Sequence, residues 1–302
     1  MDIARTALEG AKVIITYCLG VEKEEKSLIV YDEPNQEKAR IIKKAFELLG
    51  YPSPTLSPYN RLQTIEHDVV IFCVSERLTL ALGHSDLKHE VCSRGGRVGF
   101  VTQPLENTPS VQEIERIAKR TKFLAEKLEK AEGLTISTRG HSLRLYTKGR
   151  KPIAITSLIR NAGEWGALPD YAEVAIAPVE HESFGEFYVD CLIVGLGKPE
   201  NGLLITFENG RVASLKNGEI GRALKRLISS DDDAHELAEV GFGTNHLRRT
   251  PKGEFDDKKI LGSVHIALGD NHTIGGILRS KVHVDCLSIN SEVWVSGKRV
   301  FF

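Results

Sequence analysis

The chain has 302 residues, of which 41% are hydrophobic and 27% charged, and its 40 basic and 41 acidic side chains nearly cancel. This balance produces no overall field that would attract nucleic acid or an anionic membrane, so we expect neither as a partner. The apolar runs are far too short to cross a bilayer, no signal peptide is evident, and the five scattered cysteines form no CxxC pair. These features predict a cytoplasmic protein with free thiols.

The first 132 residues alternate short apolar runs with helical patterns. Strands are expected at residues 26–32, 68–74 and 97–102, and helices after Asn35, over 78–93 and over 111–131. This alternation predicts a parallel sheet with helices on both faces. Because no G-x-G-x-x-G or Walker sequence follows any of these strands, we expect no nucleotide site in this half.

From Gly133 onward the pattern is rich in strands, with one short helix expected at 219–229. Asn209-Gly210 and Ser296-Gly297 predict hairpins, since these residues tolerate positive φ. The expected strands are 134–137, 142–147, 173–177, 186–194, 203–207, 211–215, 263–268 and 282–289. The predicted fold class is therefore α/β + β: a Rossmann-like parallel-sheet α/β domain (1–132) followed by a β-rich domain (133–302).

The sharpest chemical signal is His283-Val284-Asp285, which lies in an apolar run. In a strand, His283 and Asp285 face one side, while Val282, Val284 and Cys286 face the other. A buried carboxylate requires a compensating charge. The pair therefore indicates a metal site or, alternatively, a hydrogen-bonded His–Asp pair at a strand end.

Four more polar side chains occupy comparable positions. His265 lies in a second apolar strand, and His272 lies in the glycine-ended loop that follows it. Glu239 is followed by glycines at i+2 and i+4, which leave room for another group to approach the backbone, and Glu173 opens a further strand. Taken singly, each has an ordinary alternative: a satisfied core histidine, an exposed loop histidine or a solvated charge.

Together, these segments supply three carboxylates and two or three imidazoles. Such a set suits divalent first-row metals bound through oxygen and nitrogen. A single ion held by His265, His283 and Asp285 would leave two acidic groups without a counter-charge, whereas two ions and a bridging hydroxide balance three carboxylates. We therefore expect two metal ions in the β-rich domain.

The same segments, in the same order, resemble the aminopeptidase T family of thermophilic metalloaminopeptidases. The resemblance covers Leu168-Pro169, Glu173-Val174, Glu239 with its glycines, His265-Ile266-Ala267-Leu268-Gly269 and His283-Val284-Asp285. It implies that Glu173, Glu239, His265, His283 and Asp285 are metal ligands and that the chain forms a homodimer. The family has a tyrosine where this chain has His272, and a threonine–aspartate pair where it has His141-Ser142.

By this resemblance, the chain would hydrolyse N-terminal residues from peptides with a water activated by two zinc, cobalt or manganese ions. Among this chain's own residues, Glu180, as a carboxylate not fully engaged by metal, would take the proton of the water, and His272 would donate to the developing oxyanion.

Two alternatives remain open. The sister group of dihydroxypyridine ring-opening dioxygenases implies a single iron(II) on His265, His283 and Asp285, with a small-molecule substrate. A non-catalytic family member is the other alternative, indicated by the changes at His272 and His141.

Overall fold

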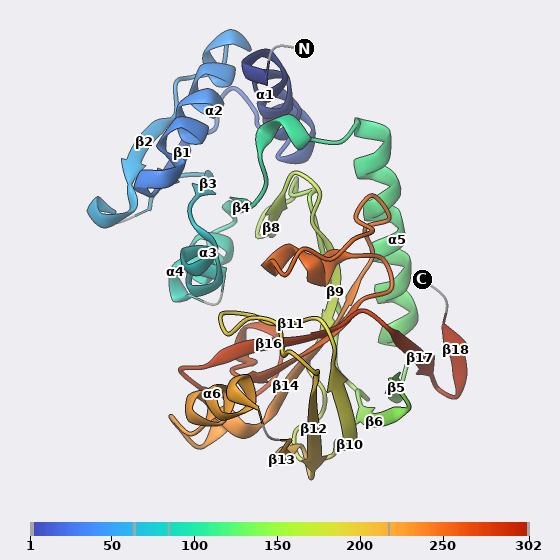
Figure 1. Cartoon of the computed structure of the whole chain (residues 1–302). Helices are drawn as coiled ribbons and strands as arrows, with labels where there is room; N and C mark the ends of the chain where they lie inside the picture. The colour runs from blue at the N-terminus through green and yellow to red at the C-terminus, as the bar shows by residue number, and fades with distance from the viewer. Residues whose placement is uncertain (1–2, 63–64, 84, 217, 301–302) are drawn as a thin grey trace. The chain divides into compact units, whose positions relative to one another are not determined.

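The chain divides into two compact units in a computed structural model that describes residues 3–62, 65–83, 85–216 and 218–300 (Figure 1). Unit 1 comprises Met1–Lys119 and Ile155–Tyr171, and unit 2 comprises Arg120–Ala154 and Ala172–Phe302. A single division at residue 132 does not describe these units, because the chain returns to unit 1 after its first excursion into unit 2. No local sequence pattern marks such a return.

Unit 1 is built on a five-stranded parallel sheet, as the alternation of strands and helices predicts. The order is β2 (Thr55–Pro58), β1 (Ser27–Tyr31), β3 (Val69–Cys73), β4 (Arg97–Val101) and β8 (Trp165–Leu168). β1, β3 and β4 lie where strands were expected, and β3 and β4 are buried along their whole length. β2 and β8 were not predicted.

The helices of unit 1 differ from expectation at two places. α1 (Ile3–Val13) and the π-helix η1 (Ile14–Cys18) were not predicted, and the helix expected over 78–93 is two helices, α3 (Glu76–Gly83) and α4 (Asp86–Ser93). Residue 84, between them, lies outside the described residues. The remaining helices are α2 (Gln36–Leu48) and the 3-10 turns η2 (Glu33–Asn35), η3 (Tyr59–Arg61) and η4 (Leu105–Asn107).

Unit 2 contains two sheets. The seven-stranded antiparallel sheet has the order β13 (Arg211–Leu215), β12 (Leu203–Glu208), β10 (Phe184–Val189), β6 (His141–Tyr146), β5 (Gly133–Thr138), β17 (Ser291–Val295) and β18 (Lys298–Val300). The six-stranded sheet has the order β11 (Leu192–Ile193), β16 (His283–Ser288), β15 (Val264–Gly269), β14 (Leu237–Gly243), β9 (Ala172–Ile176) and β7 (Ile153–Thr156). The α/β + β fold class is therefore confirmed.

The non-strand elements of unit 2 are few. α5 (Val111–Glu129), within which the chain passes from unit 1 to unit 2, and α6 (Glu219–Ile228) are both near their expected bounds. The 3-10 turns are η5 (Asp233–His235), η6 (Phe255–Lys259) and η7 (His272–Ile274). The hairpin predicted at Asn209-Gly210 joins β12 to β13, and both residues have positive φ, 49° and 76°.

One hydrophobic core fills unit 2, and one face of the six-stranded sheet packs against it. Alternate residues of β9, β14, β15 and β16 enter this core, among them Val174, Val240, Ile266 and Val284. Because strand residues alternate between faces, the residues between them lie on the opposite face. That opposite face carries the polar residues that the sequence singles out.

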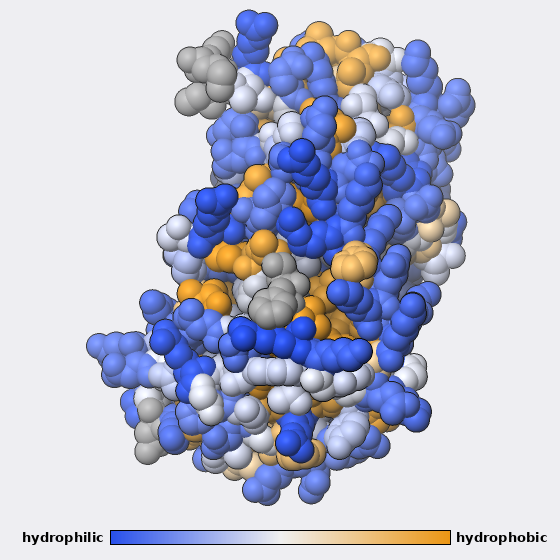
Figure 2. Space-filling model, turned by 90° about the vertical axis from the view of Figure 1, so that its right-hand side faces the viewer, coloured by the Kyte–Doolittle hydropathy of each residue, from blue (hydrophilic) through white to orange (hydrophobic). Residues whose placement is uncertain are grey.

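No helix among the described residues is long and apolar enough to span a membrane. On the face shown in Figure 2, hydrophilic residues predominate and hydrophobic residues reach the surface in separate groups.

Candidate metal centre

Four adjacent strands of unit 2 bring the five predicted ligands to one face of the sheet. Glu173 comes from β9, Glu239 from β14, His265 from β15, and His283 and Asp285 from β16. In the register of the sheet, Ala267 of β15 pairs with Glu239 on one side and with Asp285 on the other. The small methyl side chain of Ala267 leaves room for the longer polar groups around it.

Three of these residues are close enough to share one ion. One ligand atom from each of Glu173, Glu239 and His265 lies within 4.8 Å of the others, and all three side chains are buried. His265 Nε2 is 3.2 Å from Glu239 Oε1.

His283 joins the cluster from the neighbouring strand. Its Nε2 is 3.3 Å from Asp285 Oδ1 and 3.5 Å from Glu239 Oε2. All five predicted ligands therefore belong to one constellation of side chains.

The outer nitrogen of His283 fixes the orientation of its ring. Nδ1 lies 2.9 Å from the backbone carbonyl oxygen of Asp270, to which it donates when protonated, so Nε2 faces the carboxylates. Burial alone would lower the pKa of His283, but Asp285, Glu239 and the Asp270 carbonyl outweigh burial and raise this pKa to about 9.

Asp285 and Glu239 are held in their charged form. Burial would raise the pKa of Asp285, but the Lys258 ammonium and the two histidines keep it well below its usual range. Burial likewise opposes ionisation of Glu239, whose pKa is nevertheless lowered by a hydrogen bond from His265 and by the charge of His283. Anionic oxygen ligands are what a divalent cation requires.

Several ligand atoms of the cluster are buried without a hydrogen-bond partner, which tests whether the site fits a metal. Among the described residues, His265 Nδ1 has none, whereas Glu173 Oε2 and Asp285 Oδ1 have only ion-pair contacts, with Lys258 at 3.5 Å and with His283 at 3.3 Å. Native structures leave few buried polar atoms in this state, and an ion is one ordinary explanation. The donor set of carboxylate oxygen and imidazole nitrogen suits a divalent first-row ion, so the residues fit the group.

Gly241 explains the glycine that follows Glu239 in the sequence. It pairs directly with His265 across β14 and β15. A Cβ atom at Gly241 would overlap the imidazole of His265, with the ring atoms Cε1 and Nε2 nearest to it. The group for which this glycine leaves room is therefore the imidazole of His265.

Lys258 is a residue of the site that the sequence did not reveal. It is 6% exposed, and its Nζ lies 2.9 Å from Asp285 Oδ2 and 3.5 Å from Glu173 Oε2. The residue belongs to η6, whose sequence from Phe255 to Lys259 contains four charged side chains in a row and resembles a solvated loop. All five residues of this turn are nevertheless buried.

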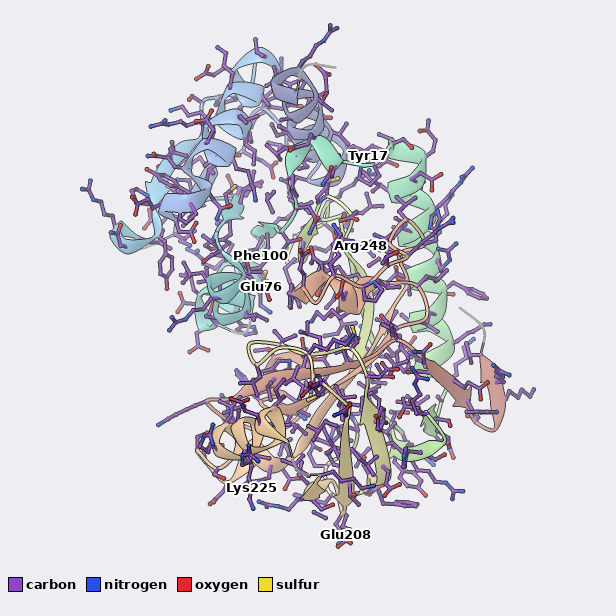
Figure 3. All side chains as sticks on the ribbon, in the orientation of Figure 1. Tyr17, Glu76, Phe100, Glu208, Lys225 and Arg248 are labelled. Atoms are coloured by element: carbon purple, nitrogen blue, oxygen red, sulfur yellow. The ribbon has the colours of Figure 1, made fainter. Side chains whose placement is uncertain are left out.

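Ion pairs and hydrogen bonds hold η6 in place. Arg248, labelled in Figure 3, lies 3.5 Å from Asp256, which also pairs with Lys259. Glu254 and Asp257 form a capping box at the start of the turn. The hydroxyl of Ser263 donates to the backbone carbonyl of Lys258 at 2.9 Å. The ammonium of Lys258 is thus carried by a fixed backbone.

His272 contacts Asp270, the residue whose backbone carbonyl orients the ring of His283. The Nδ1 atom of His272 is 2.7 Å from Asp270 Oδ1. The structure thus connects His272 to the site through Asp270. Its expected role as a donor to an oxyanion stays a prediction.

Glu180 has partners of another kind, which correct its expected role as general base. Its carboxylate pairs with Arg150, accepts a hydrogen bond from Asn271 Nδ2 at 3.1 Å and accepts another from the backbone N–H of Ile277 at 3.0 Å. Burial opposes ionisation, but these contacts lower the pKa of Glu180. A carboxylate with every oxygen engaged and a lowered pKa is a poor acceptor for the proton of a water.

His141, the other altered position, has its side-chain contacts in the other sheet of unit 2. Its Nδ1 lies 2.7 Å from Glu186 Oε2, and its ring stacks on Tyr188. Both partners belong to β10 of the seven-stranded sheet, whereas the ligands belong to the six-stranded sheet.

Fold and cluster define a protein with an α/β unit and a β-rich unit, and the β-rich unit carries a candidate site for a divalent metal. The model of the thermophilic metalloprotease (M29) family matches residues 104–297, so the chain belongs to this family. The match covers the residues of the cluster, including Lys258. No curated protein sequence was matched.

The solved structures with a similar fold include two that match nearly the whole of this chain. Structural similarity to 2,5-dihydroxypyridine dioxygenase from Pseudomonas putida KT2440 covers 100% of this chain and 96% of that chain, at 14% identity and a TM-score of 0.79. Similarity to wild-type AmpT from Thermus thermophilus covers 99% and 98%, at 16% identity and a TM-score of 0.67. At these identities the likeness is one of fold.

Proposed function

We propose that the chain is a metal-dependent aminopeptidase, which removes N-terminal residues from peptides. The observation that carries this proposal is the buried cluster of Glu173, Glu239, His265, His283 and Asp285 in a chain of a metalloprotease family. The metal is expected to be zinc, cobalt or manganese. The homodimer and the cytoplasmic location also stay predictions.

The chain's own residues would hold and orient the ion. Five side chains would supply ligand atoms from four adjacent strands: Glu173, Glu239, His265, His283 and Asp285. The Asp270 carbonyl fixes the ring of His283. A divalent ion held there supplies Lewis acidity and lowers the pKa of a water to near neutrality.

Hydrolysis of leucine and phenylalanine p-nitroanilides tests the reaction. We expect release of p-nitroaniline after addition of cobalt, zinc or manganese, and none in a chelator. The N-acetylated substrates serve as the matched control, because an aminopeptidase requires a free α-amine. No turnover with any metal, on a chain that binds metal, would refute the peptidase.

His272→Ala tests the predicted donor separately from metal binding. A single donor to a developing oxyanion contributes roughly 10²-fold to kcat, so we expect a loss of about that size with the bound metal retained. Steady-state kinetics and metal analysis of the same preparation measure the two effects. An unchanged kcat would remove His272 from the reaction.

A mononuclear iron(II) dioxygenase is the second candidate. It is favoured by the presence of His265, His283 and Asp285 in one cluster, because two histidines and one carboxylate form the facial triad of such enzymes. Anaerobic loading with iron(II), followed by oxygen uptake with 2,5-dihydroxypyridine, tests it. A chain that binds no divalent ion at micromolar concentration would instead be the non-catalytic family member.

A further inference from the structure

We propose that the ammonium of Lys258 takes the place of a second metal ion, so that the cluster binds a single divalent cation. This inference rests on the metal binding in the proposed function, and not on which reaction follows. It revises the expectation of two ions, because the charge balance behind that expectation does not include the Lys258 ammonium.

The position of Lys258 is that of a cation shared by two carboxylates. Its Nζ lies 2.9 Å from Asp285 and 3.5 Å from Glu173, and the side chain is 7% exposed. A carboxylate oxygen binds zinc at roughly 2.0–2.2 Å. An ion bound on the Lys258 side of these two carboxylates would therefore need the space that the ammonium fills.

The two carboxylate oxygens of Asp285 have different neighbours. Oδ2 pairs with the Lys258 ammonium, while Oδ1 lies 3.3 Å from His283 Nε2. Asp285 can thus bridge the ammonium and one metal ion, as a bridging carboxylate joins two ions in a dinuclear site.

The charges of the cluster balance with one ion. Glu173, Glu239 and Asp285 carry three negative charges, and one divalent ion together with the Lys258 ammonium supplies three positive charges. A second divalent ion would leave the buried cluster with an excess of positive charge, which a water-excluding site penalises.

The backbone does not let Lys258 withdraw easily. The turn that carries it is fixed by the capping box of Glu254 and Asp257 and by the hydrogen bond from Ser263. Its nearest basic neighbour, Lys259, is held by Asp256. These contacts thus keep the backbone of Lys258 in place beside the cluster.

Metal stoichiometry tests the proposal directly. The chain is stripped of metal and reloaded with Mn²⁺. Bound manganese per chain is then measured by elemental analysis, and its electron paramagnetic resonance spectrum is recorded. We expect one ion per chain and the six-line spectrum of an isolated ion, where a two-metal site would give a coupled pair.

Substitution of Lys258 supplies the second readout. Lys258→Gln removes the charge, and we expect it to double the bound manganese and to produce the coupled spectrum. Lys258→Arg keeps the charge and should retain one ion. Lys225→Gln, the same change at an exposed lysine of α6 (labelled in Figure 3), is the matched control and should also retain one ion.

Two ions in the unsubstituted chain, or one ion in a folded Lys258→Gln, would overturn the proposal. If Lys258→Gln does not fold, the count in the unsubstituted chain decides alone. No bound ion would refute the metal site itself. One bound ion without peptide hydrolysis would contradict the aminopeptidase and leave the role of Lys258 standing.

Discussion

Glu180 shows how the partners of one side chain determine what it can do. In the sequence it is a carboxylate outside the predicted ligand set, so a role as base is a reasonable hypothesis. In the fold its side chain is 5% exposed and pairs with Arg150, Asn271 and Ile277. Asn271 and Ile277 flank the turn that contains His272, so Glu180 acts on that turn as a structural anchor.

The lowered pKa of Glu180 makes a prediction about acid stability. Because the folded pKa lies below the ordinary value of about 4.3, the ionised carboxylate stabilises the fold above that pH, and this contribution disappears as the pH falls through the folded pKa. Replacing a charged hydrogen-bonded group costs about 2 kcal/mol. We therefore expect Glu180→Gln to destabilise the protein by about that amount at pH 7.

Urea unfolding between pH 7 and pH 3 measures this effect. The difference between Glu180→Gln and the unsubstituted chain should shrink toward low pH. Glu208→Gln, at the exposed end of β12 (labelled in Figure 3), is the control and should change stability little at any pH. A difference for Glu180→Gln that is constant with pH would contradict the assignment.

The burial of Lys258 could not be predicted from the residues around it in the sequence. A run of charged residues is usually solvated, and nothing local indicates that η6 is buried. Its burial depends on the pairing of Asp256 with Arg248 and Lys259, and on contacts with β9 and β14. A charge balance over the predicted ligands alone therefore leaves out the Lys258 ammonium.

Of the strands that carry the predicted ligands, those with an apolar pattern were predicted from the sequence, and the glycine-containing strand was not. β15 and β16 are apolar runs in which every second residue enters the core, so the shared face of His283 and Asp285 followed from local geometry and is confirmed. β14 was not predicted as a strand, because its two glycines lower strand propensity. Its identity depends on the pairing with β9 and β15.

Adding a methyl group at Gly241 of β14 is expected to weaken metal binding. The Cβ of Gly241→Ala would overlap the His265 ring. Because a displaced ligand or supporting group lowers metal affinity by about 10–100-fold, we expect a loss of that size with the fold retained. Isothermal titration calorimetry with Zn²⁺ measures it, and circular dichroism checks the fold.

Gly83→Ala is the matched control for this prediction. It makes the same change at the end of α3, where an added Cβ meets nothing within 4 Å. Its metal affinity should equal that of the unsubstituted chain. An unchanged dissociation constant for Gly241→Ala would show that the His265 ring moves without loss of binding.

Over the whole molecule, the metal is expected to stabilise one unit more than the other. The five predicted ligands and Lys258 all belong to unit 2. A ligand at 100 times its dissociation constant stabilises the state that binds it by about 2.7 kcal/mol. We therefore expect a higher Tm with zinc than with chelator.

Hydrogen exchange locates this stabilisation. Zinc should slow amide exchange in β14, β15 and β16, and exchange in β1 and β3 of unit 1 serves as the internal reference. Equal slowing in both units, or none in β14–β16, would contradict a metal site on these strands.

The return of the chain to unit 1 has a consequence for dissecting this protein. β8 pairs along the edge of β4, a strand whose five residues are all buried. A fragment that stopped at residue 132 would lack β8, and β4 would then present bare amide and carbonyl groups with apolar flanks. Such an edge recruits other chains and promotes aggregation. An N-terminal fragment therefore needs residues 155–171 joined back to it by a short linker if it is to stay in solution.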